Sequence, residues 1–176
     1  MRLLRRVVDL LEESEIEHCL IGAAAMAAHG APRSTLDLDL LTTDRRTLDE
    51  SLWASLDQSE TKVQVRRGDS EDPLAGVVRL SAPDERAVDL YIGRFTWQTS
   101  IIERAVPLTI QGLEIAVAEP ADLVLLKLHA GGPQDRWDIQ QMLAARPSEE
   151  WKQLVEERLA RLPRECAELW QDLRIS

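Results

Sequence analysis

The chain has 176 residues, of which 44% are hydrophobic and 30% are charged, and its formal net charge at pH 7 is −10. This length and composition predict one hydrophobic core of ordinary size, with room for a small appendage. No run of about eighteen uncharged apolar residues occurs, so a membrane-spanning helix and a membrane partner are excluded. The acidic charge does not draw the chain to nucleic acid, so a polyanionic partner would need a local basic patch or bound metal ions. The candidates for such a patch, which solvated surface arginines would equally explain, are Arg45, Arg46, Arg66 and Arg67.

The N-terminal stretch MRLLRRVVDLLEESEIEH has early arginines, but acidic residues interrupt it before a secretory core is complete. The helical spacing of its apolar residues predicts an amphipathic helix over 2–14 instead. The two cysteines, Cys19 and Cys166, lie too far apart in the sequence to form a metal or redox motif. The cytoplasm is therefore the expected compartment.

After the first helix, the sequence alternates between strand and helix patterns. Apolar runs and polar–apolar alternation predict strands over 17–22, 35–41, 61–67, 77–82, 86–94 and a hairpin over 106–118 that turns at 111–112. Helical propensity and capping residues predict helices over 23–30, 45–56, 95–105, 120–131, 133–146, 148–162 and 164–174.

This order of elements predicts an α+β fold with a small mixed β-sheet, flanking helices and a helical C-terminal third. Pro120 suits the first turn of a helix and marks the expected division of the chain. The sheet-bearing core is predicted over 1–119, and a helical segment over 120–176 is predicted to pack on or beside it.

Aspartates in two predicted strands are the strongest functional signal. Asp37 and Asp39 are two residues apart, so on a strand their carboxylates point to the same face. Like charges so close repel unless a cation lies between them, although a solvated acidic edge strand would also tolerate the pair. Asp89 lies in a second strand pattern, where acidic residues are disfavoured. Three such carboxylates suit Mg²⁺ and could hold two metal ions about 3.5–4 Å apart, an arrangement used in phosphoryl transfer.

Residues around this pair are candidates for binding phosphate. Gly22 ends one predicted strand and opens a helix, where free backbone N–H groups favour a phosphate, and the alanines from Ala23 onward would allow a close approach. A tight strand-to-helix turn alone explains the same residues. Arg33 could reach a phosphate, pair with Asp37 or cap the preceding helix. Lys127 interrupts an apolar helix, so it either snorkels to solvent or contacts a ligand.

The pair Gly22-Ala23, then thirteen residues, then the sequence DLDL starting at Asp37, resembles the signature of the DNA polymerase beta-like nucleotidyltransferase superfamily. In that superfamily a later strand carries the third carboxylate, which Asp89 would supply. The resemblance implies an NTP substrate and Mg²⁺ or Mn²⁺ as cofactor. It also implies that the first two aspartates bind both metal ions, while Asp89 binds the catalytic one and helps deprotonate the acceptor. Ala23 departs from the usual glycine or serine, so a hydroxyl contact with phosphate is lost.

Two stretches, HGAPRSTLDLDLL and KLHAGGPQDRWDI, resemble the AbiEii-like toxin nucleotidyltransferases and their uncharacterised relatives. The matching residues are His29, Gly30, Arg33, Thr35, Lys127, Asp135 and Asp138. By this resemblance, Lys127 would contact the triphosphate as a point charge. The same resemblance implies a toxin of a toxin–antitoxin pair, with an antitoxin protein as partner. It allows RNA such as the 3′ end of a tRNA, a protein hydroxyl or a small molecule such as an aminoglycoside as acceptor.

Two other functions compete with catalysis of nucleotidyl transfer. The fold could be retained as a binding or regulatory module with weak or no catalysis. Ala23 favours this, as does the late motif, which has Gly132, Pro133 and Gln134 where an arginine or lysine often precedes the acidic residue. A haloacid dehalogenase-like phosphatase also carries Asp-x-Asp, but at the end of its first strand and after an uninterrupted apolar run. Here Ser34 and Thr35 precede the aspartates and a helix lies upstream, so the phosphatase is the less favoured alternative.

Overall fold

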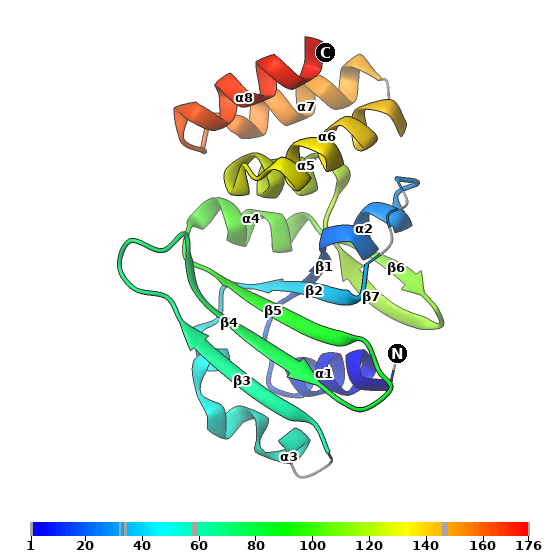
Figure 1. Cartoon of the computed structure of the whole chain (residues 1–176), viewed down its shortest axis with the longest axis vertical. Helices are drawn as coiled ribbons and strands as arrows, with labels where there is room; N and C mark the ends of the chain where they lie inside the picture. Colours follow the sequence, from blue (N-terminus) through cyan, green and yellow to red (C-terminus); the bar gives the residue numbers. More distant parts are fainter. Residues whose placement is uncertain (1, 32, 34, 58–59, 146–147, 176) are drawn as a thin grey trace.

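The computed structural model describes residues 2–31, 33, 35–57, 60–145 and 148–175 (Figure 1). Its centre is a mixed sheet of seven strands: β1 (Cys19–Ile21), β2 (Asp37–Thr42), β3 (Lys62–Arg67), β4 (Leu74–Ser81), β5 (Ala87–Gly93), β6 (Val106–Ile110) and β7 (Leu113–Val117). The strand order is β3-β4-β5-β2-β1-β7-β6, with β2–β5 and β1–β7 parallel and the other neighbours antiparallel. The α+β fold with a mixed sheet is confirmed, and each of the seven strands overlaps one that the sequence predicted.

Helices cover both faces of this sheet (Figure 1). They are α1 (Arg2–Glu13), α2 (Gly22–Ala28), the short 3-10 helices η1 (Arg45–Leu48) and η2 (Glu50–Trp53), α3 (Ala54–Asp57), α4 (Thr96–Arg104), α5 (Pro120–Ala130), α6 (Pro133–Ala145), α7 (Glu149–Leu159) and α8 (Arg164–Ile175). α1 and α3 lie on one face, while α2, α4 and the bundle of α5 to α8 lie on the other. None of the helices in the described ranges is long and apolar enough to cross a membrane.

Alternation along β2 and β5 sends apolar side chains to one face of the sheet and the aspartates to the other. Leu38 and Leu40 are buried, and their register partners on β5 are Val88 and Leu90, also buried. The apolar side of the amphipathic helix α1 closes this part of the core, as its helical spacing predicts. The core therefore fixes the register that places Asp37, Asp39 and Asp89 on the opposite face. A shift of either strand by one residue would turn its apolar side chains away from the core.

The helix predicted over 45–56 is wrong in form, because the structure breaks it into η1, η2 and α3. Asp44 caps the first piece, accepting a hydrogen bond from the backbone of Arg46. Asp49 interrupts the run: its backbone is extended, and its side chain accepts from the backbone N–H of Ser51. An aspartate that bonds a nearby N–H in this way competes with the helix interior and starts a new turn instead.

The hairpin predicted at 111–112 is confirmed, with positive φ at both Gln111 and Gly112, as a two-residue turn requires. The C-terminal helices begin with Pro120 in the first turn of α5, and Gly131 ends α5 in the left-handed conformation. α5 contacts α2 as well as α6, α7 and α8. The division of the chain at 119/120 stays a prediction.

Candidate active site

Parallel pairing of β2 and β5 brings the three predicted aspartates together. Asp39 lies directly opposite Asp89, and Asp37 lies two residues earlier on the same face of β2. Asp89 is buried, with 6% of its surface exposed, whereas the Asp37 side chain is 36% exposed. The structure thus gathers all three carboxylates at one place on the sheet.

An arginine that sequence reasoning missed lies among these carboxylates. Arg79 of β4 is the register partner of Asp89. Its Nη1 donates to Asp89 Oδ2 at 2.7 Å, and its Nη2 donates to Asp37 Oδ1 at 3.1 Å. The sequence of the β4–β5 hairpin could have revealed this contact, because Arg79 and Asp89 lie the same number of positions before and after Asp84 in its turn. Pairing the hairpin around that turn would have placed the two side chains opposite each other.

Some carboxylate oxygens of the cluster remain unpaired. Asp89 Oδ1 is buried and has no hydrogen-bond partner among the described residues. Burial, together with the charges of Asp89 and Asp37, raises the pKa of Asp39 from 3.8 to about 6, and the positive charges of Lys127 and Arg33 oppose this shift. Burial also raises the pKa of Asp89, against the opposing effect of its ion pair. The cluster therefore carries excess negative charge that a cation would relieve.

Gly22 allows β1 to run close against Asp39. Its φ is +66°, and a Cβ at this position would lie 2.0 Å from Asp39 Oδ2. Only glycine fits, because both the backbone conformation and the space exclude a side chain. Ala23 follows at the start of α2 with its methyl group buried. Gly22 lines the cavity described below, whereas Ala23 does not.

Across from the carboxylates, Lys127 of α5 and Arg33 are held by Asp138 of α6. Lys127 Nζ lies 2.5 Å from Asp138 Oδ2 and 3.2 Å from Asp135 Oδ1, while Arg33 Nε lies 3.3 Å from Asp138 Oδ1. Asp138 is fully buried, and the Lys127 side chain is only 11% exposed. Lys127 therefore does not snorkel to solvent, and Arg33 pairs with α6 rather than with Asp37. In the sequence Asp138 stood out only through the AbiEii-like resemblance, and the packing of α6 on α5 shows it as the anchor of both cations.

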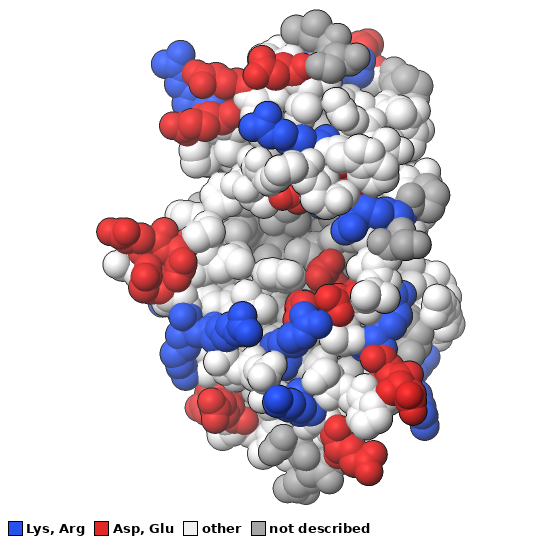
Figure 2. Space-filling view, in the orientation of Figure 1, with Lys and Arg blue, Asp and Glu red and all other residues white. Residues whose placement is uncertain are grey.

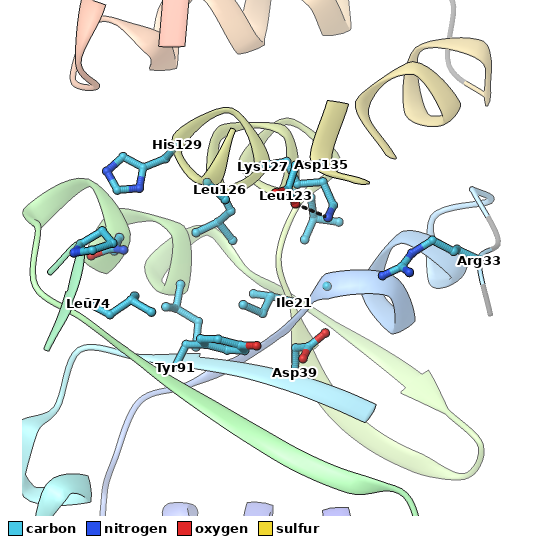
Figure 3. Close-up of a pocket in the computed structure, with 15 residues that line it drawn as sticks. Ile21, Arg33, Asp39, Leu74, Tyr91, Leu123, Leu126, Lys127, His129 and Asp135 are labelled. Carbon is cyan, nitrogen blue, oxygen red and sulfur yellow. Dashed lines mark hydrogen bonds and ion pairs between the residues drawn. The ribbon is translucent and has the colours of Figure 1, made fainter. Parts of the chain in front are cut away.

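A cavity of about 390 Å³ separates the two groups of charges. Figure 2 shows it as a hollow between the sheet and the C-terminal helices, with acidic and basic side chains at its rim. Figure 3 shows Asp39 and Tyr91 on the sheet side, Lys127 with Asp135 on the helical side, and Arg33 toward one end.

The rest of the cavity wall is mostly apolar and aromatic, with Gln98 as a polar exception. Leu74, Leu126 and His129 line it (Figure 3). The ring of His129 packs edge-on against Phe95 and tilts against Trp97, with centroid distances of 5.7 and 5.1 Å. Burial lowers the pKa of His129, which favours the neutral ring. One end of the cavity is thus polar and charged, and the other can accommodate an apolar or planar group.

Two of the arginines considered as a basic patch are engaged in contacts within the protein. Arg46 is engaged with Asp44 and with the carbonyl groups of residues 14 and 15. Arg67 donates to the carbonyl of Leu48. Arg66 is exposed on β3, and its charge acts on Asp89.

In the described part of the chain, no three or more Asp, Glu, His or Cys side chains are arranged to hold a metal ion as they stand. The donor chemistry nevertheless fits a hard divalent cation, because the cluster offers three carboxylates and an unpaired buried oxygen on Asp89. The guanidinium of Arg79 pairs with both Asp37 and Asp89.

A match over nearly the whole chain shows the family to which this protein belongs. Residues 1–171 match the family described as "Nucleotidyl transferase of unknown function (DUF2204)". The chain belongs to this family. The match agrees with the nucleotidyltransferase superfamily expected from the Gly22 and DLDL motifs, and the AbiEii-like subgroup stays a prediction. Among proteins with curated descriptions, none is similar enough in sequence to match.

Solved structures share the fold of this nucleotidyltransferase family member. A protein from Thermotoga maritima, provisionally assigned as a nucleotidyltransferase, aligns with a TM-score of 0.57 and 19% identity over 82% of this chain and 92% of its own. The lincosamide antibiotic adenylyltransferase LnuA, solved with lincomycin bound, aligns with a TM-score of 0.52 and 15% identity over 79% and 93%. An antigenic nucleotidyltransferase-like protein from Paracoccidioides brasiliensis aligns with a TM-score of 0.51 and 16% identity over 97% and 91%.

The fold also disfavours the phosphatase alternative. The strand with the aspartates is the second one, it runs antiparallel to β1, and the aspartates lie at its beginning. A haloacid dehalogenase-like enzyme would need the pair at the end of its first strand.

Proposed function

We propose that this protein transfers a nucleoside monophosphate from an NTP to a hydroxyl group of an acceptor and releases pyrophosphate, with Mg²⁺ or Mn²⁺ as cofactor. The observation that carries the proposal is the pairing of opposite charges across one cavity. Asp39 lines its sheet side, with Asp89 directly opposite it on β5 and Asp37 two residues earlier on the same face of β2. Lys127 lines its helical side, and Arg33 lies toward one end. This arrangement suits a polyphosphate bound between metal-binding carboxylates and fixed cations.

Asp37, Asp39 and Asp89 would hold the divalent cation. A bound Mg²⁺ would neutralise phosphate charge and lower the pKa of the attacking hydroxyl. The raised pKa of Asp39 and the unpaired Asp89 Oδ1 both mark a site that lacks sufficient positive charge. Neither is explained by a solvated acidic strand, since Asp89 is buried.

The side chains then have distinct roles in the transfer. Lys127 and Arg33 would bind the phosphates, and Asp138 would hold both cations in place. Asp89 Oδ1 would accept the proton of the acceptor hydroxyl, whose oxygen bonds to the α-phosphorus as the bond to the pyrophosphate oxygen breaks. Gly22 and Ala23 would bring backbone N–H groups close to the phosphates.

The direct test is label transfer from α-labelled ATP, CTP, GTP and UTP in Mg²⁺ to RNA, to protein and to a panel of small hydroxyl compounds. We expect transfer to one of these acceptor classes and its loss in Asp39→Ala. Glu114→Ala is the matched control, because it removes an exposed carboxylate from β7 at a distance from the cavity. Unchanged transfer and unchanged Mn²⁺ affinity in Asp39→Ala would refute the assignment.

A second candidate function, a nucleotidyltransferase fold that binds nucleotide without catalysis, is favoured by Ala23. The superfamily resemblance places a glycine or serine at this position, and the alanine cannot supply a hydroxyl contact. Calorimetry with NTP and Mg²⁺ separates the two functions: tight binding without label transfer to any acceptor class would favour the binding module.

The late motif around Lys127 carries the further proposal of an AbiEii-like toxin with an antitoxin partner. Induced expression of the wild type and of Asp39→Ala in a bacterial host tests it. Growth arrest by the wild type alone would support a toxin, and equal growth of both strains would reject it. The acceptor class found by label transfer would then name the cellular target.

A further inference from the structure

The guanidinium group of Arg79 lies among the three carboxylates of the cluster. It contacts Asp89 Oδ2 at 2.7 Å and Asp37 Oδ1 at 3.1 Å, so one side chain bridges two strands. The planar fork of arginine permits this double contact, whereas the ammonium group of lysine acts as a single point charge. Arg79 thereby engages two oxygen atoms that a metal ion bound by Asp37 and Asp89 would use.

This guanidinium neutralises the cluster only in part. Asp89 Oδ1 stays buried without a hydrogen-bond partner in the described ranges. No hydrogen bond or ion pair joins the Asp39 carboxylate to the described residues, and it lies directly opposite Asp89 and two residues from Asp37 on the same face. One positive charge among three carboxylates leaves a demand for further positive charge that a divalent cation can meet.

Arg79 is also free to leave its position. Its side chain is 43% exposed, and its register partner on the other side, Gln64 of β3, is neutral. The Arg79–Asp37 pair is partly exposed on both sides, and pairs of this kind are worth about 0.2–1 kcal/mol, up to about fivefold in an equilibrium constant. Asp89 is buried, so its pair with Arg79 is given up only when another cation takes the place of the guanidinium.

We propose that Arg79 is a built-in counter-ion of the metal site: it holds Asp37 and Asp89 in the metal-free protein and is displaced when a divalent cation binds. Arg79 then sets the metal concentration at which the site fills. The inference rests on the proposed function, because it takes the three aspartates as metal-binding residues.

The experiment is a calorimetric titration of the full chain with Mn²⁺ at pH 7.5, without nucleotide, together with thermal denaturation in EDTA and in Mn²⁺. The variants are Arg79→Gln, Arg79→Lys and the control Arg66→Gln. Arg66 lies two residues from Gln64 on β3, so its side chain is on the same face as Arg79. Its charge acts on Asp89, and it has no ion pair with the three aspartates. The control therefore measures the effect of a nearby positive charge alone.

We expect Arg79→Gln to bind Mn²⁺ about twofold to thirtyfold more tightly than the wild type, since up to two competing ion pairs are lost. Arg79→Lys should fall between the two, and Arg66→Gln should change the affinity by less than about twofold. In EDTA, Arg79→Gln should melt at a lower temperature than the wild type and gain more from Mn²⁺.

Equal or weaker Mn²⁺ binding by Arg79→Gln would overturn the inference, because the arginine would then organise the site instead of competing for it. If Arg79→Gln does not fold, Arg79→Lys decides by the same comparison. Asp39→Asn distinguishes a failure of the proposed metal site from a failure of the proposed role of Arg79. If that variant keeps the Mn²⁺ affinity of the wild type, the proposed function itself fails. If it loses the affinity while Arg79→Gln matches Arg66→Gln, only the inference on Arg79 fails.

Discussion

Replacing Asp39 by asparagine should make the metal-free protein more stable while it removes function. Asp39 is forced to ionise at neutral pH in a place where burial and two neighbouring carboxylates oppose its charge. An asparagine has nearly the same shape and no charge, so it relieves this cost. A residue kept for function at the expense of stability is the expected signature of a binding site.

The magnitude follows from the pKa of Asp39, which folding raises from 3.8 to about 6. A shift of about two units corresponds to roughly 3 kcal/mol of lost stability once both states are ionised, and local rearrangement reduces this to about 1–3 kcal/mol. Between these two pKa values the folded state binds more protons than the unfolded state. The wild type therefore loses stability as the pH rises from about 4 to 6, and the loss is complete above that range.

Urea denaturation in EDTA at several pH values between 4 and 8 measures this effect. At pH 7.5 we expect Asp39→Asn to exceed the wild type by about 1–3 kcal/mol, a rise in melting temperature of about 2–10 °C for a chain of this size. The difference should shrink as the pH falls toward 4, where the wild-type carboxyl is protonated. Asp37→Asn is the matched control on the same strand, and it should not stabilise, because it loses an ion pair with Arg79.

Two results would refute this reasoning. The first is a free energy of unfolding for Asp39→Asn that is equal to or below that of the wild type at pH 7.5. The second is a stabilisation that does not depend on pH, since that would come from packing and not from the ionised carboxylate.

Further substitutions test the geometry around the cavity. Gly22→Ala should destabilise the fold by about 1–3 kcal/mol and displace Asp39, because the new Cβ would lie 2.0 Å from its Oδ2 at a φ of +66°; unchanged stability and Mn²⁺ affinity would contradict this. Asp138→Asn should raise the KM for NTP by about tenfold with little change in Mn²⁺ affinity, because Lys127 loses a charged partner 2.5 Å away; steady-state kinetics check it. Asp122→Ala removes a fully buried carboxylate that pairs with two arginines and should cost about 3–5 kcal/mol in chemical denaturation, and a loss below 1 kcal/mol would argue against it.

Local patterns in the sequence determined most of the elements. The alternation around Asp37 and Asp39, the turn residues at 111–112 and Pro120 each predicted the element that the structure contains. Short-range physics is sufficient there, since strand alternation, left-handed turn residues and a proline in the first helical turn act within a few positions. The prediction of one helix over 45–56 was wrong, and the cause is again local: the hydrogen bond that Asp49 accepts from the backbone of Ser51 outweighs helical propensity.

The sequence by itself determined which carboxylates and which lysine were candidates, because charged residues stand out in apolar strands and helices. Only the tertiary structure decided what each one faces. Parallel pairing of β2 with β5 set Asp39 opposite Asp89, and the β4–β5 hairpin placed Arg79 beside Asp89 on the neighbouring strand. Packing of α6 on α5 fixed Lys127 through the buried Asp138. The Arg79–Asp89 pair spans a single hairpin and could have been read from the turn. The other contacts depend on strand register between β2 and β5 and on helix packing, which no local pattern encodes.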